Sequence, residues 1–340
     1  MIRRVAILLI LPGQHPGVFP GIVLIRLVNK TIPMGAKKPF RLVGVDIRQN
    51  FIRLVGLSGG DFGYQIEMGV NLELQDAEIS DEVIASAIKS TLRQASPKFK
   101  QAAVALSHTA IIFKEFQVPV ELSRKEINKF LHFHFAECAK EYSAGDLGFD
   151  CQVTEAGNDS FRLQAVAVRR AHADKWVKLL LKAGLYSEIL DIDIYAIERA
   201  IRLQLENVEG LAAVVNMDHG QVLIIVLDSK KIVYVHEDVF DIDAVVSIDK
   251  VLELFDTKLR LIYSALSQPI EVVVLGGEKA LLPGLVDAVS DRFDLRVVLA
   301  NPFMGMKVAN TVSQGNIFQL APLMLISCGL ALRVRDADHN

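Results

Sequence analysis

The sequence predicts an α/β protein of two lobes, because it contains two copies of one strand-turn-strand pattern. The first copy, Val43–Leu57, reads VGVDIRQNFIRLVGL, and the second, Ala213–Leu227, reads AVVNMDHGQVLIIVL. A shift of 170 residues places Asp46 on Asn216 and aligns the apolar strands on either side. Two such hairpins that face each other would form a cleft, with turn amides directed at a phosphate chain from both sides.

A double-glycine turn supports this prediction. Residues Val272–Gly284 read VVVLGGEKALLPG, which predicts a strand, a tight turn and the start of a helix. Gly276 and Gly277 remove side chains where a ligand could approach the backbone, and the amides at 280–284 could meet an anion. A plain strand-to-helix turn explains the same glycines. The sequence contains neither a Walker A motif nor GxGxxG.

The remaining elements follow from capping and periodicity. Ser80 is the expected N-cap of a helix with acidic residues in its first turn, and Ser123–Glu126 is a capping box that starts a helix ending near Tyr142. Gly184 is expected to end a helix that begins near Asp174. Further strands are predicted at 61–74, 102–106, 111–118, 161–168, 222–227, 231–236 and 295–299, and further helices at 194–206, 249–266 and 319–333.

These elements divide the chain into four parts. Residues 1–38 form an N-terminal extension, 39–106 with 172–195 form the first lobe, 107–171 form an inserted α+β subdomain, and 196–340 form the second lobe. The extension carries a short apolar run that several prolines interrupt. We expect it to be poorly ordered or to precede a true start at Met34; a signal peptide and a real N-terminal strand are the alternatives.

Composition limits the classes of function. The 340 residues suffice for two cores, and the net charge of −3 without any basic run argues against nucleic acid as a partner. Cys138, Cys151 and Cys328 have no metal or redox spacing, so we expect reduced, buried thiols. No apolar stretch reaches the roughly 18–20 residues of a membrane span, so we expect no transmembrane segment.

Taken together, the hairpins and the glycine turn resemble the actin/Hsp70/sugar-kinase ATPase superfamily. Within that superfamily the chain is similar to PilM proteins, in motif order and over roughly residues 40–334. The motifs that carry this resemblance are FQVPVELS (116–123), LGFDCQV (147–153), QAVAVR (164–169), AGLYSEILDIDIYAIER (183–199), ANPF (300–303) and LAPLMLISCGLALR (320–333).

The resemblance implies an actin-like, ribonuclease H-like fold with a duplicated βββαβα unit and an inserted α+β subdomain. It also implies a cytoplasmic, FtsA-like scaffold at the inner-membrane platform of a type IV pilus, which holds the short cytoplasmic tail of a PilN-like membrane protein. The ligand of such a protein would be ATP with Mg²⁺, and homo-oligomers would be possible. Alternative assignments with the same resemblance are the MshI protein of MSHA pili and the cytoplasmic domain of GspL in type II secretion.

Residue by residue, the resemblance places Asp46 beside Mg²⁺, which it would hold through water. An Asx turn between two strands explains the same residue. The turn that follows departs from the family's small residues and holds Arg48, Gln49 and Asn50, of which Arg48 could contact phosphate as a guanidinium fork. The other residues assigned to the nucleotide are Asn216, Asp218 and Gly220 in the second hairpin, and Gly276, Gly277 and Lys279 at the adenosine side.

The second hairpin also departs from the family pattern. Asn216 replaces an aspartate, and Asp218 stands where a glycine is usual; it would either act as a carboxylate near the metal or repel phosphate. The stretch between Leu227 and Val272 is also short, which predicts a trimmed second lobe. Asp191 and Asp193 either face the cleft or cap the helix that follows.

A partner groove is implied between the first lobe and the insert. Its assigned residues are Phe116, Lys129, Phe130 and Phe133, and an extended peptide could add to an edge strand there. Phenylalanines at helical spacing are also typical of a core.

Three hypotheses of function follow: an ATP-gated adaptor, a nucleotide-free adaptor, and a sugar-kinase-like phosphotransferase. We expect no enzymatic activity beyond a weak ATPase, because no carboxylate base is recognisable in the sequence.

Overall fold

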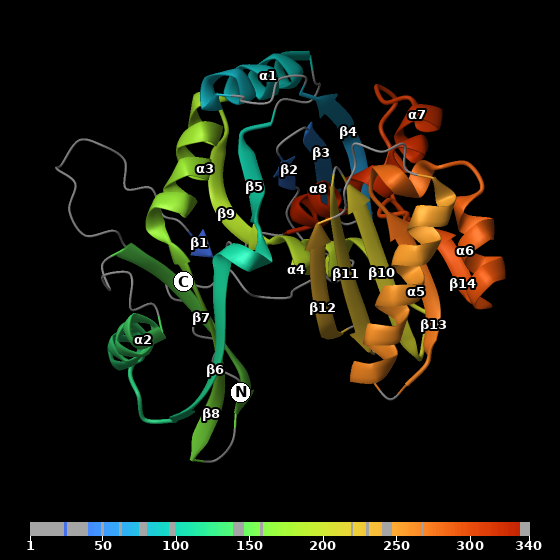
Figure 1. The fold of residues 1–340 in the computed structure, drawn as a ribbon. Helices are drawn as coiled ribbons and strands as arrows, with labels where there is room; N and C mark the ends of the chain where they lie inside the picture. Colours follow the sequence, from blue (N-terminus) through green and yellow to red (C-terminus); the bar gives the residue numbers. More distant parts are fainter. Residues whose placement is uncertain are drawn as a thin grey trace.

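The molecule contains two mixed sheets with a smaller third sheet attached to the first (Figure 1). The strand orders are β1-β9-β5-β2-β3-β4-β15, β12-β11-β10-β13-β14 and β6-β8-β7. The structure is a computed structural model that describes residues 24–25, 40–48, 51–60, 63–74, 80–94, 99–138, 146–156, 159–218, 220–228, 231–239, 247–266 and 268–333.

The two large sheets repeat one connectivity, as the sequence predicts. In the first, an antiparallel meander is followed by a helix and by two parallel strands: β2 (Phe40–Ile47), β3 (Phe51–Gly60), β4 (Gly63–Glu73), α1 (Asp81–Gln94), β5 (Gln101–Leu106) and, after the insert and α3 (Arg170–Lys182), β9 (Tyr186–Ile192). In the second, the same order is β10 (Leu211–Asp218), β11 (Gln221–Asp228), β12 (Lys231–Val239), α5 (Ile248–Ala265), β13 (Ile270–Gly276), α6 (Leu285–Phe293) and β14 (Arg296–Leu299).

The strand register confirms the shift of 170 residues between the copies. Asp46 lies opposite Arg53 in the first hairpin, and Asn216 lies opposite Leu223 in the second. The equivalent strands therefore end at equivalent places in the two sheets.

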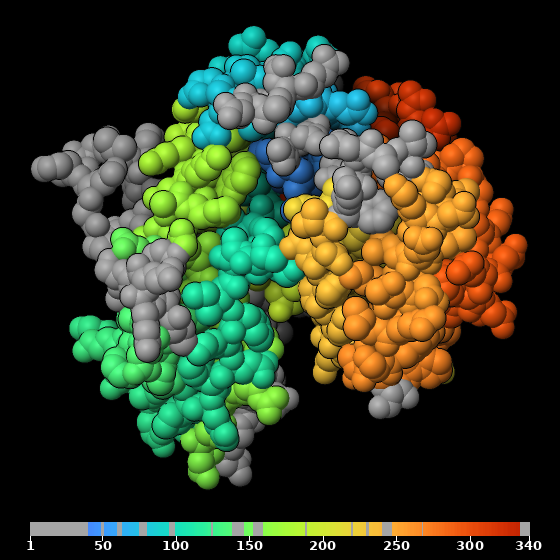
Figure 2. Space-filling model, in the orientation of Figure 1, coloured from blue at the N-terminus to red at the C-terminus, as the bar shows by residue number. Residues whose placement is uncertain are grey.

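The insert is a three-stranded antiparallel sheet covered by one helix. After the short 3₁₀ helix η1 (His108–Ala110) come β6 (Ile111–Pro119), α2 (Arg124–Cys138), β7 (Leu147–Ala156) and β8 (Ser160–Arg169). Ser123 and Glu126 form the predicted capping box: the Ser123 amide donates to the Glu126 carboxylate at 2.8 Å. Ile127, Leu131 and Phe135 bury the inner face of α2. Figure 2 shows an open gap between the insert and the second lobe on this face of the molecule.

Two central helices join the lobes. Helices α4 (Asp193–Ile201) and α8 (Leu325–Ala331) lie between the sheets, whereas α1 and α3 cover the outer face of one sheet and α5 and α6 that of the other (Figure 1). The central cluster combines Leu42 from β2, Val214 from β10 and Ile326 from α8. One apolar layer therefore contains residues of both lobes and holds the lobes together.

Glycines permit this close packing. A Cβ atom on Gly44 of β2 would lie 1.8 Å from the Ser327 carbonyl oxygen of α8, and one on Gly329 would lie 1.8 Å from the Ala196 carbonyl oxygen of α4. Any side chain at either position would force the two backbones apart.

The C-terminal region differs from the single helix predicted at 319–333. It consists of α7 (Gln314–Gln319), the 3₁₀ turn η4 (Ala321–Met324) and α8. Pro322 stands in the first turn of η4, where its missing N–H ends the preceding hydrogen-bond ladder and permits a new start. Shortly before it, β15 (Lys307–Val308) pairs with β4 and joins the first sheet.

The predicted helix ends and cysteine environments are also found in the structure. Ser80 accepts from the Val83 amide at 3.4 Å as the N-cap of α1, and Gly184 follows α3 with a φ of 86°. Cys151 and Cys328 are free and buried, as predicted. Of residues 1–38, only Leu24–Ile25 is described, as strand β1 parallel to β9; Met34 lies outside the described residues. Within the described part of the chain, no helix is long and apolar enough to cross a membrane.

We predict that Gly329→Ala destabilises the protein by about 3 kcal/mol, because the new Cβ overlaps the α4 backbone. Gly315→Ala is the matched control: nothing lies within 4 Å of its Cβ, and alanine favours helix by up to about 1 kcal/mol. Urea unfolding of both variants measures the difference. Equal stability of the two variants would contradict the packing described for α8.

Candidate functional site

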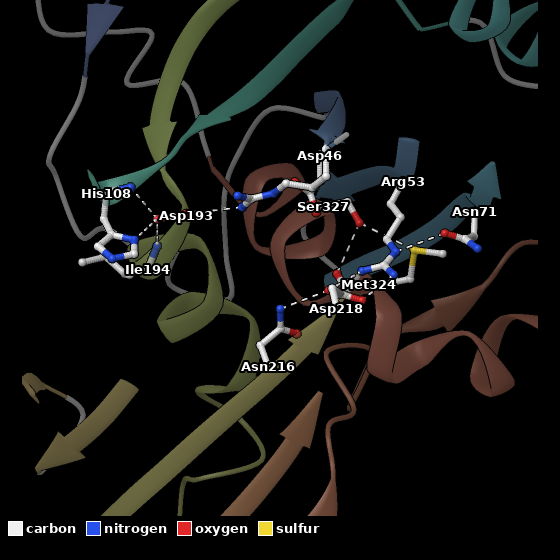
Figure 3. A network of polar contacts seen from close by, with 11 residues as sticks. Asp46, Arg53, Asn71, His108, Asp193, Ile194, Asn216, Asp218, Met324 and Ser327 are labelled. Carbon is white, nitrogen blue, oxygen red and sulfur yellow. Dashed lines mark hydrogen bonds and ion pairs between the residues drawn. The ribbon is translucent and has the colours of Figure 1, made fainter. Parts of the chain in front are cut away.

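Charged side chains of the two lobes meet where β2 and β10 end (Figure 3). Residues 42–46 of β2 and 211–217 of β10 are buried, and polar side chains come at the carboxyl ends of these buried runs. The charged groups form two hydrogen-bonded networks, one around Asp193 and one around Asp218, and the charges of Arg53 and Asp218 also act on Asp46.

The first network links Asp46, Arg48, Asp193 and His108. The Arg48 guanidinium donates from Nε to Asp46 Oδ1 at 3.0 Å and from Nη2 to Asp193 Oδ2 at 3.3 Å. Asp193 Oδ1 accepts from the amide of His108 at 3.0 Å and lies 3.2 Å from its Nδ1. Asp193 also accepts from the Ile194 amide at 2.8 Å, so it begins α4 while it faces the cleft.

This network reaches the second lobe through His108. Its Nε2 lies 3.9 Å from the Glu237 carboxylate on β12. His108 therefore lies between carboxylates of the two lobes, with Arg48 on the far side of Asp193.

Burial and charged partners shift the pKa values of the side chains in this network. Burial raises the pKa of Asp46 above its ordinary value despite the charge of Arg48. Burial alone would also raise the pKa of Asp193, but its contacts with His108 and Arg48 outweigh burial and lower it. The hydrogen bond with Asp193 raises the pKa of His108.

The second network is an ion pair between the lobes. Arg53 of β3 donates from Nη1 and Nη2 to the two oxygens of Asp218 on β10, at 2.8 and 2.7 Å. Its Nε donates to Asn71 at 3.1 Å, and its guanidinium carbon lies 3.7 Å from the centre of the Phe51 ring. The side chains of Arg53 and Asp218 are only 3% and 13% exposed, so water screens this pair little.

Asp218 accepts two further hydrogen bonds from its own lobe. The Asn216 side-chain amide donates at 3.1 Å, and the backbone amide of Glu278 donates at 2.9 Å. Burial opposes ionisation of Asp218, but Arg53 and these donors together lower its pKa. The carboxylate is therefore ionised at neutral pH.

The double-glycine turn packs against the second hairpin. Gly277 has a φ of 81°, and its Cβ would lie 2.4 Å from the Met217 carbonyl oxygen. Its amide donates to the Pro322 carbonyl at 2.8 Å, which ties the turn to η4. Lys279 pairs with Glu278 at 3.2 Å, and Gly220 has a φ of 81° that permits the tight turn after β10.

The structure brings together most of the residues assigned to a nucleotide. Asp46 and Arg48 lie in one network and Asn216 and Asp218 in the other; the assigned residues Gly220, Gly276, Gly277 and Lys279 flank the second. Asn50 lies outside the described residues. Sequence reasoning missed Arg53 and His108. The available signal for Arg53 was a lone charge within the apolar run 51–57.

The residues present do not fit Mg-ATP in this arrangement. Asp46, expected beside Mg²⁺, is directed at Arg48, and Asp218 places a second negative charge near the phosphate-side turns. Each of the three nitrogens of the Arg53 guanidinium, which could neutralise phosphate, already donates to Asp218 or Asn71. Among described side chains, no group of three or more potential metal ligands lies together.

The residues assigned to a partner fall into two sets. Phe116 and Phe130 pack edge to face at 5.1 Å between ring centres and border the core of the insert. Phe133 is 61% exposed on α2, and Lys129 is exposed one turn before it. Phe116 and Phe130 are only partly exposed, so the second set offers a partner the more accessible side chains.

We predict strong coupling between Arg53 and Asp218. Arg53→Met leaves a buried carboxylate without its cation and should cost about 3–5 kcal/mol of stability. Asp218→Asn should cost less when Met already replaces Arg53, since that carboxylate then has no cation to lose. Urea unfolding of both single variants and the double variant gives the coupling energy. Additivity within about 0.5 kcal/mol would show that the pair does not act as a unit.

We predict that His108 makes stability depend on pH. Because its pKa is raised on folding, its contribution is fully present below the unfolded pKa of about 6.5 and is lost as pH rises through the folded pKa. The free energy of unfolding of the parent minus that of His108→Gln should therefore fall between acidic and alkaline pH. A difference that stays constant with pH would contradict the contacts of His108 with Asp193 and Glu237.

Comparison with known proteins identifies the family. The sequence matches the family described as type IV pilus assembly protein PilM over residues 44–258 and 243–335. A solved structure of the PilM-PilN type IV pilus biogenesis complex aligns with a TM-score of 0.68 and 18% identity, covering 86% of this chain and 98% of that chain.

Two more distant structures align with TM-scores below 0.5. The ethanolamine utilization protein EutJ from Carboxydothermus hydrogenoformans gives 0.48 at 14% identity, covering 89% of this chain and 91% of that one. The cytoplasmic domain of EpsL, from the type II secretion system of Vibrio cholerae, gives 0.43 at 12% identity, covering 83% and 94%. The predicted actin-like fold is confirmed, and the chain belongs to the PilM family of type IV pilus assembly proteins.

Proposed function

We propose that this protein is a cytoplasmic adaptor of a pilus or related secretion platform, peripheral to the inner membrane. It binds the short cytoplasmic tail of a PilN-like membrane protein and couples that protein to other platform subunits. The observation that carries the proposal is the PilM family match, which spans both lobes and the insert. The similar solved structure is a PilM-PilN complex, which supports the class of partner.

The tail would bind in the groove between the first lobe and the insert. Strand β1 lies there: it pairs in parallel with β9, with Leu24 opposite Ile189, and it contacts β7. Strand β1 is already the edge strand there, so the tail would add to β1 or take its place, with backbone hydrogen bonds supplying affinity and alternate side chains entering pockets. Helix α2 packs on β7, which β1 also contacts, through His132 and Phe149 at 4.2 Å between ring centres. We assign Lys129 and Phe133 as tail contacts because they are exposed on this helix.

We favour the nucleotide-free form of this adaptor. The pairings of Asp46 with Arg48 and of Arg53 with Asp218 support it, since they use the groups that would otherwise meet Mg²⁺ and phosphate. The ATP-gated alternative makes a different prediction: micromolar Mg-ATP binding that Asp46→Ala and Gly277→Trp both remove. Calorimetry on these proteins separates the two forms.

We predict that Phe133→Glu lowers affinity for the tail at least about tenfold, because it places a charge on an apolar contact. Fluorescence anisotropy with a labelled peptide of the PilN-like tail measures the affinity. Phe318→Glu is the matched control, since Phe318 is 44% exposed on α7, away from the insert. Equal affinity of both variants would remove Phe133 from the contact.

The adaptor role itself is tested by isolating the protein from native membranes with its pilus or secretion subunits. Association with the PilN-like protein that the labelled tail competes away supports the proposal. A folded protein that binds neither the tail nor any platform subunit would overturn it.

A further inference from the structure

The carboxylate of Asp218 occupies a site built from four hydrogen-bond donors. Oδ1 accepts from Arg53 Nη2 at 2.7 Å and from the Glu278 amide at 2.9 Å. Oδ2 accepts from Arg53 Nη1 at 2.8 Å and from Asn216 Nδ2 at 3.1 Å. A carboxylate offers about four acceptor positions, so this one is saturated.

The donors converge from separate parts of the chain. Arg53 lies on β3 of the first lobe, Asn216 on β10 of the second, and Glu278 directly after the double-glycine turn (Figure 3 shows the first two). Each belongs to a segment that the sequence pattern places around a bound phosphate. The anion at their centre comes from the protein itself.

The same donor set suits a phosphate group. A guanidinium fork binds carboxylate and phosphate oxygens with similar two-point geometry, and backbone and side-chain amides add directed hydrogen bonds to either. Arg53 is also held in place independently of Asp218, by the Asn71 oxygen at 3.1 Å and by the Phe51 ring below it. The fork would therefore keep its orientation if the carboxylate were absent.

Asp218 fills the centre of the donor set with its side chain alone. Its backbone does not have a positive φ, and glycine can adopt its conformation without strain. Removal of this one side chain would leave the donors and open the space that the carboxylate fills.

We infer that Asp218 is a built-in anion that replaces a bound phosphate and lets Arg53 hold the two lobes together without a ligand. The cleft is thus a latent oxyanion site, blocked by one side chain. This inference concerns the cleft alone and does not depend on the partner proposed above.

The test uses Asp218→Gly in the full chain, with calorimetric titration of inorganic phosphate, pyrophosphate and Mg-ATP. The parent should bind none of them up to about 5 mM, and the variant should bind at least one with a Kd below about 0.5 mM, a gain of tenfold or more. Preference for Mg-ATP over pyrophosphate would identify a nucleotide site, and equal binding would identify a simple oxyanion site; both support the inference.

Two further variants separate the built site from nonspecific attraction. Asp218→Asn removes the negative charge but keeps the side chain in place, and should gain no binding. Arg53→Gln combined with Asp218→Gly should lose the gained binding. Binding to Asp218→Asn as tight as to Asp218→Gly would show that lost repulsion alone explains the gain, and would overturn the inference.

Stability provides a second measurement. Asp218→Gly leaves Arg53 without its carboxylate, so we expect a lower Tm. About 5 mM pyrophosphate should raise that Tm, because a bound ligand adds RT ln(1 + [L]/Kd) to the free energy of unfolding. A variant that neither binds nor is stabilised by these anions overturns the inference, whether it is folded or partly unfolded. Binding of Mg-ATP by the parent protein would overturn it as well.

Discussion

The contact between Arg53 and Asp218 determines how the two lobes are arranged at the cleft. This contact pairs two largely buried, oppositely charged side chains, one from each large sheet. Its two hydrogen bonds fix the orientation of the two side chains as well as their distance. A buried charge is tolerated only when its partner is present, so the two lobes depend on each other for a stable cleft. The turn after β13 joins the arrangement through the Glu278 amide.

Apolar packing supplies the rest of the connection. Helices α4 and α8 contribute to one cluster with residues of both sheets, and glycines at 44 and 329 let the backbones approach. Apolar packing holds the two lobes together but constrains their relative orientation little, whereas the two-point ion pair fixes that orientation. Together they support a rigid scaffold, which suits a protein whose proposed task is to hold a partner's tail.

Much of this architecture was accessible from the sequence, because it repeats. The shift of 170 residues that aligns the hairpins is reproduced by the strand register, and the insert's capping box forms as expected. Three features were not accessible for physical reasons. In the sequence Arg53 is an isolated charge in an apolar strand, and only the tertiary structure brings Asp218 into contact with it. The role of His108 likewise depends on contacts with Asp193 and Glu237, which are 85 and 129 positions away. The break before α8 depends on Pro322, whose effect on a strongly apolar run is ambiguous locally.

The position of α8 has a consequence for synthesis of the chain. Helix α8 lies near the C-terminal end, yet it covers the inner face of β2 and β3, which are made near the beginning; β15 likewise completes the edge of that first sheet at β4. The first lobe therefore cannot bury this face while it emerges from the ribosome. The face that α8 covers stays without that helix until synthesis has advanced 285 positions, from Phe40 to Leu325 (325 − 40). Contacts this distant along the chain favour slow folding and reliance on chaperones during synthesis.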